Sequence, residues 1–268
     1  TPEGEIDADT INLYSSLHVL DVNGDGHLDI VAVLEPLPDG PVRYGLAFGL
    51  GDGQFHDQVE DPPPTEPNNR MRLITPAHVS GGGEDNPCKE AIPFWLGDLD
   101  GDGDVDVVSS RGVLIQLTEL QQSPNELMFG GGCNRRWRNA VVGQFNDNDM
   151  LDVAAARASD LGSSVIEFFD GDGKGSFTSS LISTSDPVLH MAAGDYDGDL
   201  IDDIAFSQAL TGTGSSQLDD RISVSFGRPS GTPEAPRAYG KTPIVGQLMS
   251  GRFVGSDSAS DIIVSSGF

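Results

Sequence analysis

Three segments of the chain repeat a short pattern of oxygen-bearing side chains and then turn apolar. They read DVNGDGHLDIVAV from Asp21, DLDGDGDVDVVSS from Asp98 and DYDGDLIDDIAFS from Asp195. Side-chain oxygens fall at positions 1, 3, 5 and 9 of each segment, the spacing by which a tight loop wraps carboxylates around a hard cation such as calcium. The sequence therefore predicts a metal-binding repeat protein.

The three loops differ in charge, and position 7 of each supplies a backbone carbonyl. Loop two (residues 98–106) and loop four (195–203) carry four carboxylates at these positions, whereas loop one (21–29) carries three and an asparagine. Leu200 stands at position 6 of loop four, where a left-handed glycine is expected. Calcium fits better than magnesium, which demands octahedral geometry and keeps its waters. The predicted ligands are Asp21, Asn23, Asp25, His27 and Asp29 in loop one, Asp98, Asp100, Asp102, Asp104 and Asp106 in loop two, and Asp195, Asp197, Asp199, Ile201 and Asp203 in loop four.

Two degenerate copies extend the series. Loop three (144–152) offers Gln144, Asn146, Asn148 and Asp152, of which only the last is charged, and it predicts a weak fourth calcium site. Loop five begins at Arg252, is one residue too long and has lost its ligands. First positions at 21, 98, 144, 195 and 252 give a period typical of a solenoid, propeller or array.

Other readings of the acidic pattern are weaker. An EF-hand or a dockerin needs flanking helices, and the EF-hand needs a glutamate at position 12. Position 12 is Ala32, Ser109 and Phe206 in loops one, two and four, and the flanking residues are β-branched. Plain acidic turns remain an alternative for a single loop, but three loops in register would crowd carboxylates that repel one another without a cation.

Composition favours an exported β protein. The 268 residues include 34 Gly and 17 Pro, which suit short strands joined by tight turns. A net charge of −27, from 42 acidic and 15 basic residues, argues against nucleic acid or an anionic membrane as partner. We expect no direct membrane insertion, because no stretch of 18 apolar residues occurs. The start TPEGEI lacks Met and a signal peptide, which favours a processed or excerpted chain.

Apolar runs place each acidic loop between two strands. LHVL at Leu17, PFWL at Pro93, AVV at Ala140 and HMAA at His190 precede loops one to four, and a β-branched run such as IVAVL at Ile30 follows. A third run ends in an aromatic and glycine turn in YGLAFGLGDGQF, VIEFFDGDGKGSF and ISVSFGRPSG, although the second repeat offers only GVLIQLTEL. Four antiparallel strands in about 50 residues make one blade of a β-propeller.

The loop DxDxDGxxD between two strands, followed by a phenylalanine and glycine turn, resembles the FG-GAP and VCBS repeats of integrin α-subunit propellers and many secreted bacterial proteins. The resemblance covers nearly all of residues 1–268 and implies an all-β, calcium-stabilised propeller, with about five repeats present here and the last incomplete. It further implies an extracellular, cell-surface or periplasmic, non-catalytic module for binding or adhesion, with a protein or glycan partner. Alternatives are a structural propeller of a larger secreted assembly, such as a toxin shell, or an accessory domain of a secreted enzyme.

A search for catalytic or ligand-contacting residues yields one weak candidate. The five histidines show no HExxH spacing, and no GxSxG elbow occurs. The run CNRRWR places Arg135, Arg136 and Arg138 around Trp137. These arginines either pair with neighbouring acidic loops or, with an exposed Trp137, contact an anion or a glycan.

The two cysteines, Cys88 and Cys133, lie 10 and 11 residues before loops two and three, and each follows a glycine triplet. Equivalent sites in successive repeats favour a disulfide, and two reduced thiols are the alternative. We expect mass spectrometry without reductant to show a cross-linked peptide, as export would expose both thiols to oxidising conditions. Two freely alkylated thiols would reject the pairing.

Overall fold

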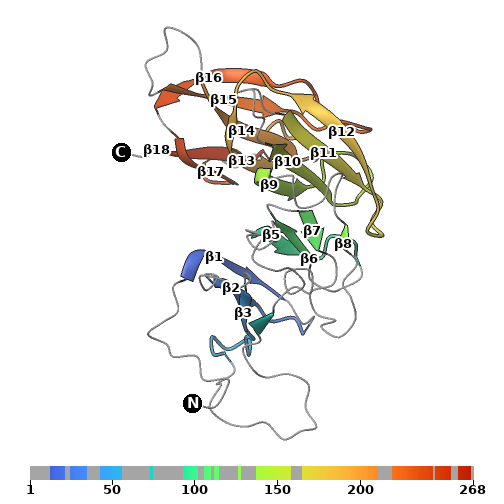
Figure 1. Cartoon of the computed structure of the whole chain (residues 1–268), viewed down its shortest axis with the longest axis vertical. Helices are drawn as coiled ribbons and strands as arrows, with labels where there is room; N and C mark the ends of the chain where they lie inside the picture. The colour runs from blue at the N-terminus through green and yellow to red at the C-terminus, as the bar shows by residue number, and fades with distance from the viewer. Residues whose placement is uncertain are drawn as a thin grey trace, which may run out of the picture. The chain divides into compact units, whose positions relative to one another are not determined.

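The computed structural model describes residues 13–21, 25–34, 43–55, 73–74, 93–101, 106–109, 112–114, 126–127, 137–157, 165–210, 219–243, 245–254 and 259–266. The regular structure in these ranges consists of eighteen β-strands in five antiparallel sheets, without a helix (Figure 1). The prediction of an all-β chain is therefore confirmed. No helix in the described ranges has the length and apolar character of a membrane span.

The chain divides into two compact units, Thr1–Asp98 with Asp102–Asn134, and Leu99–Gly101 with Arg135–Phe268. The first contains two four-stranded sheets, ordered β1-β2-β3-β4 and β5-β6-β7-β8. Neighbours in sequence are neighbours in each sheet, so both are simple meanders. The strands are β1 (Leu13–Leu20), β2 (Asp29–Leu34), β3 (Arg43–Ala47), β4 (Leu73–Ile74), β5 (Pro93–Gly97), β6 (Asp106–Ser109), β7 (Gly112–Leu114) and β8 (Glu126–Leu127).

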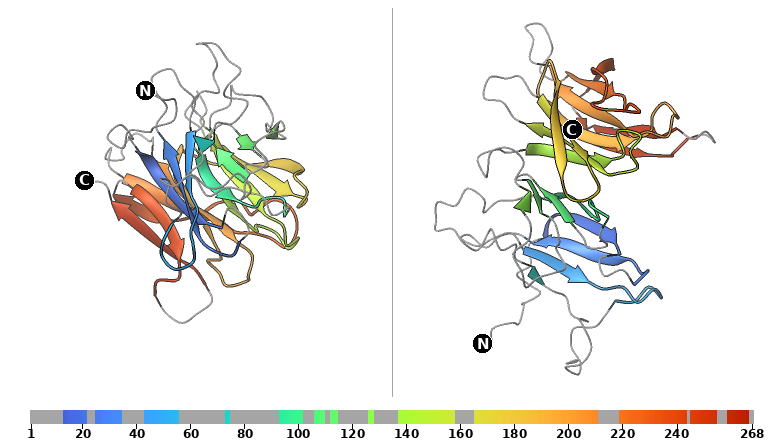
Figure 2. Two further views of the ribbon diagram at one scale, coloured as in Figure 1. Left: turned by 90° about the horizontal axis from the view of Figure 1, so that it is seen from below. Right: turned by 90° about the vertical axis from the view of Figure 1, so that its right-hand side faces the viewer.

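The second unit holds two further four-stranded meanders and a two-stranded sheet, β17-β18 (Figure 2). Each four-stranded sheet follows the predicted order of strand, acidic loop, strand, third strand and fourth strand. The strands are β9 (Trp137–Gly143), β10 (Asp152–Arg157), β11 (Val165–Gly171), β12 (Phe177–Ser183), β13 (Val188–Gly194), β14 (Asp203–Ala209), β15 (Asp219–Ser225), β16 (Arg237–Pro243), β17 (Val245–Gly251) and β18 (Asp261–Ser266).

All five acidic loops close in one register. In every sheet, the residue just before the loop pairs across the first two strands with the aspartate that ends the loop. The pairs are Leu20 with Asp29, Gly97 with Asp106, Gly143 with Asp152, Gly194 with Asp203 and Gly251 with Asp261. The repeat predicted from spacing is thus a repeat of backbone geometry, including degenerate loops three and five.

Successive sheets of the second unit pack through their first strands, since β13 contacts both β9 and β17. A core of fully buried residues, including Phe145, Phe168 and Phe206, joins the β9–β12 sheet to the β13–β16 sheet. The loops are also linked by main-chain bonds. The N–H of Asp202 donates to the carbonyl of Gln144 over 2.8 Å, and that of Ser260 donates to the carbonyl of Asp195.

In the first, third and fourth repeats, a glycine at or just beyond the end of the third strand lies against the loop of its own sheet. At Gly49, Gly171 and Gly227, a Cβ would clash with the carbonyl oxygen of the residue before the loop's last aspartate: Leu28, Leu151 and Asp202 respectively. Contact with backbone cannot be relieved by a rotamer change. The glycine of the predicted aromatic and glycine turn is therefore required by close packing.

We expect Gly171→Ala to destabilise the protein by about 1 to 3 kcal/mol, because the added methyl group must displace the loop backbone. Urea unfolding measures the loss, with Ser179→Ala, an exposed position on β12, as the control. Equal stabilities of the two variants would show that the loop can move aside without cost.

Candidate metal centres

The last aspartate of the loop is buried in loops one to four, where its exposed fraction is at most 1%. Its carboxylate accepts the N–H of the third-strand glycine, over 2.7 Å from Gly49 to Asp29, 2.8 Å from Gly171 to Asp152 and 2.8 Å from Gly227 to Asp203. In loops three and four it also accepts the N–H at loop position 2, from Phe145 and Tyr196. This aspartate thus pins the loop to its sheet.

The first aspartate organises the turn from the opposite end. Asp195 accepts the N–H groups of Gly198, Asp199 and Leu200 over 2.6 to 3.1 Å, and Asp21 does the same for Asp25 and Gly26 over 3.2 and 2.8 Å. These bonds wrap the main chain around a carboxylate, so loops one and four share one turn.

Position 6 is left-handed wherever the structure describes it. Its φ is 85° at Gly26, 58° at Asp149 and 73° at Leu200. The sequence-based expectation that Leu200 occupies a glycine conformation is therefore confirmed. A branched apolar residue in this region costs roughly 1 to 2 kcal/mol, and Leu200 is also 78% exposed.

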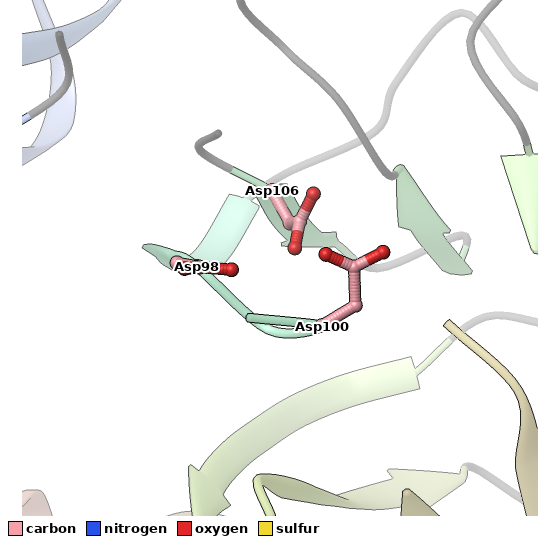
Figure 3. Close-up of side chains that lie close together, drawn as sticks. All are labelled: Asp98, Asp100 and Asp106. Atoms are coloured by element: carbon pink, nitrogen blue, oxygen red, sulfur yellow. The ribbon is translucent and has the colours of Figure 1, made fainter. Parts of the chain in front are cut away.

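Two of the predicted sites bring three carboxylates together. In loop two these are Asp98, Asp100 and Asp106, and Figure 3 shows the side chains of Asp100 and Asp106 converging above the turn. In loop four they are Asp195, Asp197 and Asp203. One oxygen from each residue lies within 4.8 Å of the others in its cluster, so either group could hold a metal ion.

Electrostatics supports this assignment for loop four. Burial, together with the charges of Asp197 and Asp199, raises the pKa of Asp203 to about 6, although bonds from Gly227 and Tyr196 act in the opposite direction. Burial also raises the pKa of Asp197, with Asp199 and Asp195 contributing by repulsion. A bound cation would offset the repulsion between these carboxylates, and a site made only of carboxylates suits a hard ion.

Other predicted ligands are only partly accounted for. Asp199 accepts the N–H of Ile201 over 2.9 Å and stands outside the three-residue cluster of loop four. Among the described residues of loop one, Asp21, Asp25 and Asp29 form no comparable cluster, and the N–H of His27 donates to Asp25. The predicted ligands Asn23, Asp102 and Asp104 lie outside the described residues.

Loop three contains a carboxylate that the sequence pattern missed. Asp170, on β11, accepts hydrogen bonds from the side-chain amides of Asn146 and Asn148 over 2.9 and 3.0 Å. It occupies the place before the third-strand glycine that Phe48 and Phe226 occupy in the first and fourth repeats. That departure from the aromatic and glycine pattern, next to a loop depleted of charge, was the available signal.

Of the two readings of the basic cluster, the one that requires an exposed Trp137 is wrong. Its side chain is 4% exposed, packs on Phe169 with ring centroids 5.5 Å apart, and donates from Nε1 to Glu167 over 3.0 Å. Glu167 also pairs with Arg157. The indole belongs to the core because β9 points it inward, where Glu167 satisfies its only donor. Arg138 is exposed, whereas Arg135, Arg136, Cys88 and Cys133 lie outside the described residues.

No protein-family model matches the chain, and no curated protein matches it significantly.

The raised pKa of Asp152, the last aspartate of loop three, allows its burial to be tested. Burial raises the pKa of Asp152 to about 7, the charge of Asp170 adds to the shift, and bonds from Gly171 and Phe145 oppose it. The folded pKa lies above the unfolded value, so this contribution to stability is fully present below about pH 4 and is lost as pH rises through about 7. Asp152→Asn should therefore gain stability relative to wild type across that range.

Denaturant unfolding from about pH 4 to about pH 8 measures this difference. Asp172→Asn serves as the control whose effect should not change over this range, because bonds from Ser176 and Lys174 lower the pKa of Asp172 and place its titration below about pH 4. A stability difference between wild type and Asp152→Asn that stays constant with pH would contradict the assignment.

Proposed function

We propose that the chain is a calcium-binding β-propeller module of the FG-GAP and VCBS kind, with loops two and four as its principal cation sites. The observation that carries this proposal is the convergence of three carboxylates in each of these loops, on a turn whose register recurs in every sheet. Calcium would be held by Asp98, Asp100 and Asp106, and by Asp195, Asp197 and Asp203. It would add positive charge between the three carboxylates of each cluster, which repel one another.

The propeller assignment is supported by sheet order and packing. Four sheets are four-stranded meanders, and in the second unit β9, β13 and β17 follow one another as neighbouring first strands. Sheets that repeat through their first strands are the construction unit of a propeller. Loop one remains a third proposed site, with Asn23 completing its ligands.

The proposed role is binding or adhesion outside the cell, without catalysis, towards a protein or glycan. A cation in a loop between the first two strands would fix the strand ends from which neighbouring loops project, and rigid scaffolds with variable loops commonly carry recognition. Because Trp137 is buried, the contact surface of this proposal excludes its indole. The partner itself rests on the family resemblance alone.

We expect calcium to raise the melting temperature and chelator to lower it, since an ion bound only by the folded state adds about 2.7 kcal/mol per site at about 100 times Kd. Asp197→Asn should remove much of this gain, because it deletes one charge of the loop-four cluster while Asp197 accepts only one long backbone bond, 3.3 Å from Asp199.

Asp172→Asn is the matched control, because it removes the same charge from the β11–β12 turn and leaves the cluster intact. Melting is followed by circular dichroism, and affinity by calorimetric titration. Identical melting temperatures in calcium and in chelator would contradict the proposal.

A further inference from the structure

Loop three fixes the orientation of two side-chain amides. Asn146 Oδ1 accepts the N–H of Asn148 over 3.0 Å, and Asn148 Oδ1 accepts the N–H of Met150 over 2.8 Å. A backbone N–H can only donate, so these bonds turn the amide oxygens toward the main chain. Each Nδ2 group must then point to the other side of its side chain.

Both Nδ2 groups use both of their protons on the sheet. Asn146 Nδ2 donates to Asp152 over 3.2 Å and to Asp170 over 2.9 Å. Asn148 Nδ2 donates to Asp170 over 3.0 Å and to the carbonyl of Gly171 over 3.1 Å. Asn146 is 5% exposed. The network therefore closes within the protein, with every amide proton satisfied.

Loops three and four have side chains of different charge at equivalent positions. Loop four has Asp197 and Asp199 at positions 3 and 5, and a phenylalanine before its third-strand glycine. Loop three has asparagines at positions 3 and 5, and Asp170 before Gly171. Loop three therefore has amide groups at positions 1, 3 and 5, where loop four has carboxylates, and it has one additional carboxylate on the third strand. The amide N–H groups at positions 3 and 5 are the donors that this carboxylate accepts.

We propose that loop three is a permanently closed clamp that needs no cation, because the two Nδ2 groups provide the positive charge density that an ion would otherwise supply. For an ion to replace them, both amides would have to flip. The N–H groups of Asn148 and Met150, both exposed residues, would then exchange their side-chain acceptors for water, at a cost of about 0.5 to 1.5 kcal/mol each.

The clamp would also act on loop four. The main chain of Gln144 is bonded in both directions to Asp202, which accepts the N–H of Gln144 on Oδ2 over 2.9 Å and donates its own N–H to the carbonyl. Asp202 directly precedes Asp203, a member of the loop-four cluster. The closed loop three thus holds one end of its calcium-binding neighbour in place when calcium is absent. This effect, unlike the clamp, rests on the proposed function.

Amide hydrogen exchange with and without chelator tests whether loop three is independent of metal while loop four is not. The exchange is compared at two equivalent hydrogen bonds, from Gly171 to Asp152 in loop three and from Gly227 to Asp203 in loop four. Chelation should accelerate exchange at Gly227 by about tenfold or more and leave Gly171 unchanged. Equal acceleration at both would overturn the metal-independent clamp. If neither changes, calcium binding by loop four is refuted while metal independence of loop three is upheld.

A double-mutant cycle tests the clamp without reference to any metal site. Asn148→Ala and Asp170→Ala, alone and together, are unfolded in urea in calcium and in chelator. Because a bond to a charged acceptor is lost only once, the two effects should be non-additive by about tenfold in the unfolding equilibrium constant, equally in both media. Asn148→Ala with Asp172→Ala, which share no bond, should be additive.

Additive effects of Asn148→Ala and Asp170→Ala in both media would overturn the clamp. So would coupling confined to chelator, because that result means that calcium displaces the amides.

Discussion

The repeat depends on the hydrogen bonds of the aspartate that ends each acidic loop, which is buried in loops one to four. In the third and fourth repeats its two carboxylate oxygens accept main-chain N–H groups from the loop on one side and from the third strand on the other. One side chain therefore joins three segments that are separated along the chain. Burial of a carboxylate is unfavourable by itself, and these charge-assisted bonds offset part of that cost.

This anchor explains why a loop can lose its cation ligands and keep its shape. The turn is already defined by the last aspartate, by a left-handed residue at position 6 and by the cross-strand register, none of which requires an ion. The loops differ in the charge of the side chains that line the inside of the turn. Loop four gathers carboxylates there, which favours a cation, whereas loop three fills the same place with amide groups and an acidic residue from β11.

Sequence periodicity predicted the strands, the loops between them and the conformation of Leu200, because each follows from spacing within one short segment. It failed for Trp137 and Asp170. The burial of Trp137 depends on Glu167, thirty residues away on another strand, and local composition pointed instead to an exposed basic cluster. Asp170 was missed because its role appears only when β11 is placed beside loop three, a contact that sheet formation creates.

The meander order of the sheets also bears on how the chain folds. Every strand pair in the described sheets joins neighbours in sequence, so most pairings close comparatively short loops, which lowers the entropic cost of forming an individual sheet. The bonds between Gln144 and Asp202, and between Asp195 and Ser260, span more than 50 residues and can form only after the sheets that carry them. Folding of the second unit should then proceed as formation of separate hairpins followed by their docking, with coupling limited to adjacent neighbours, as in a one-dimensional array.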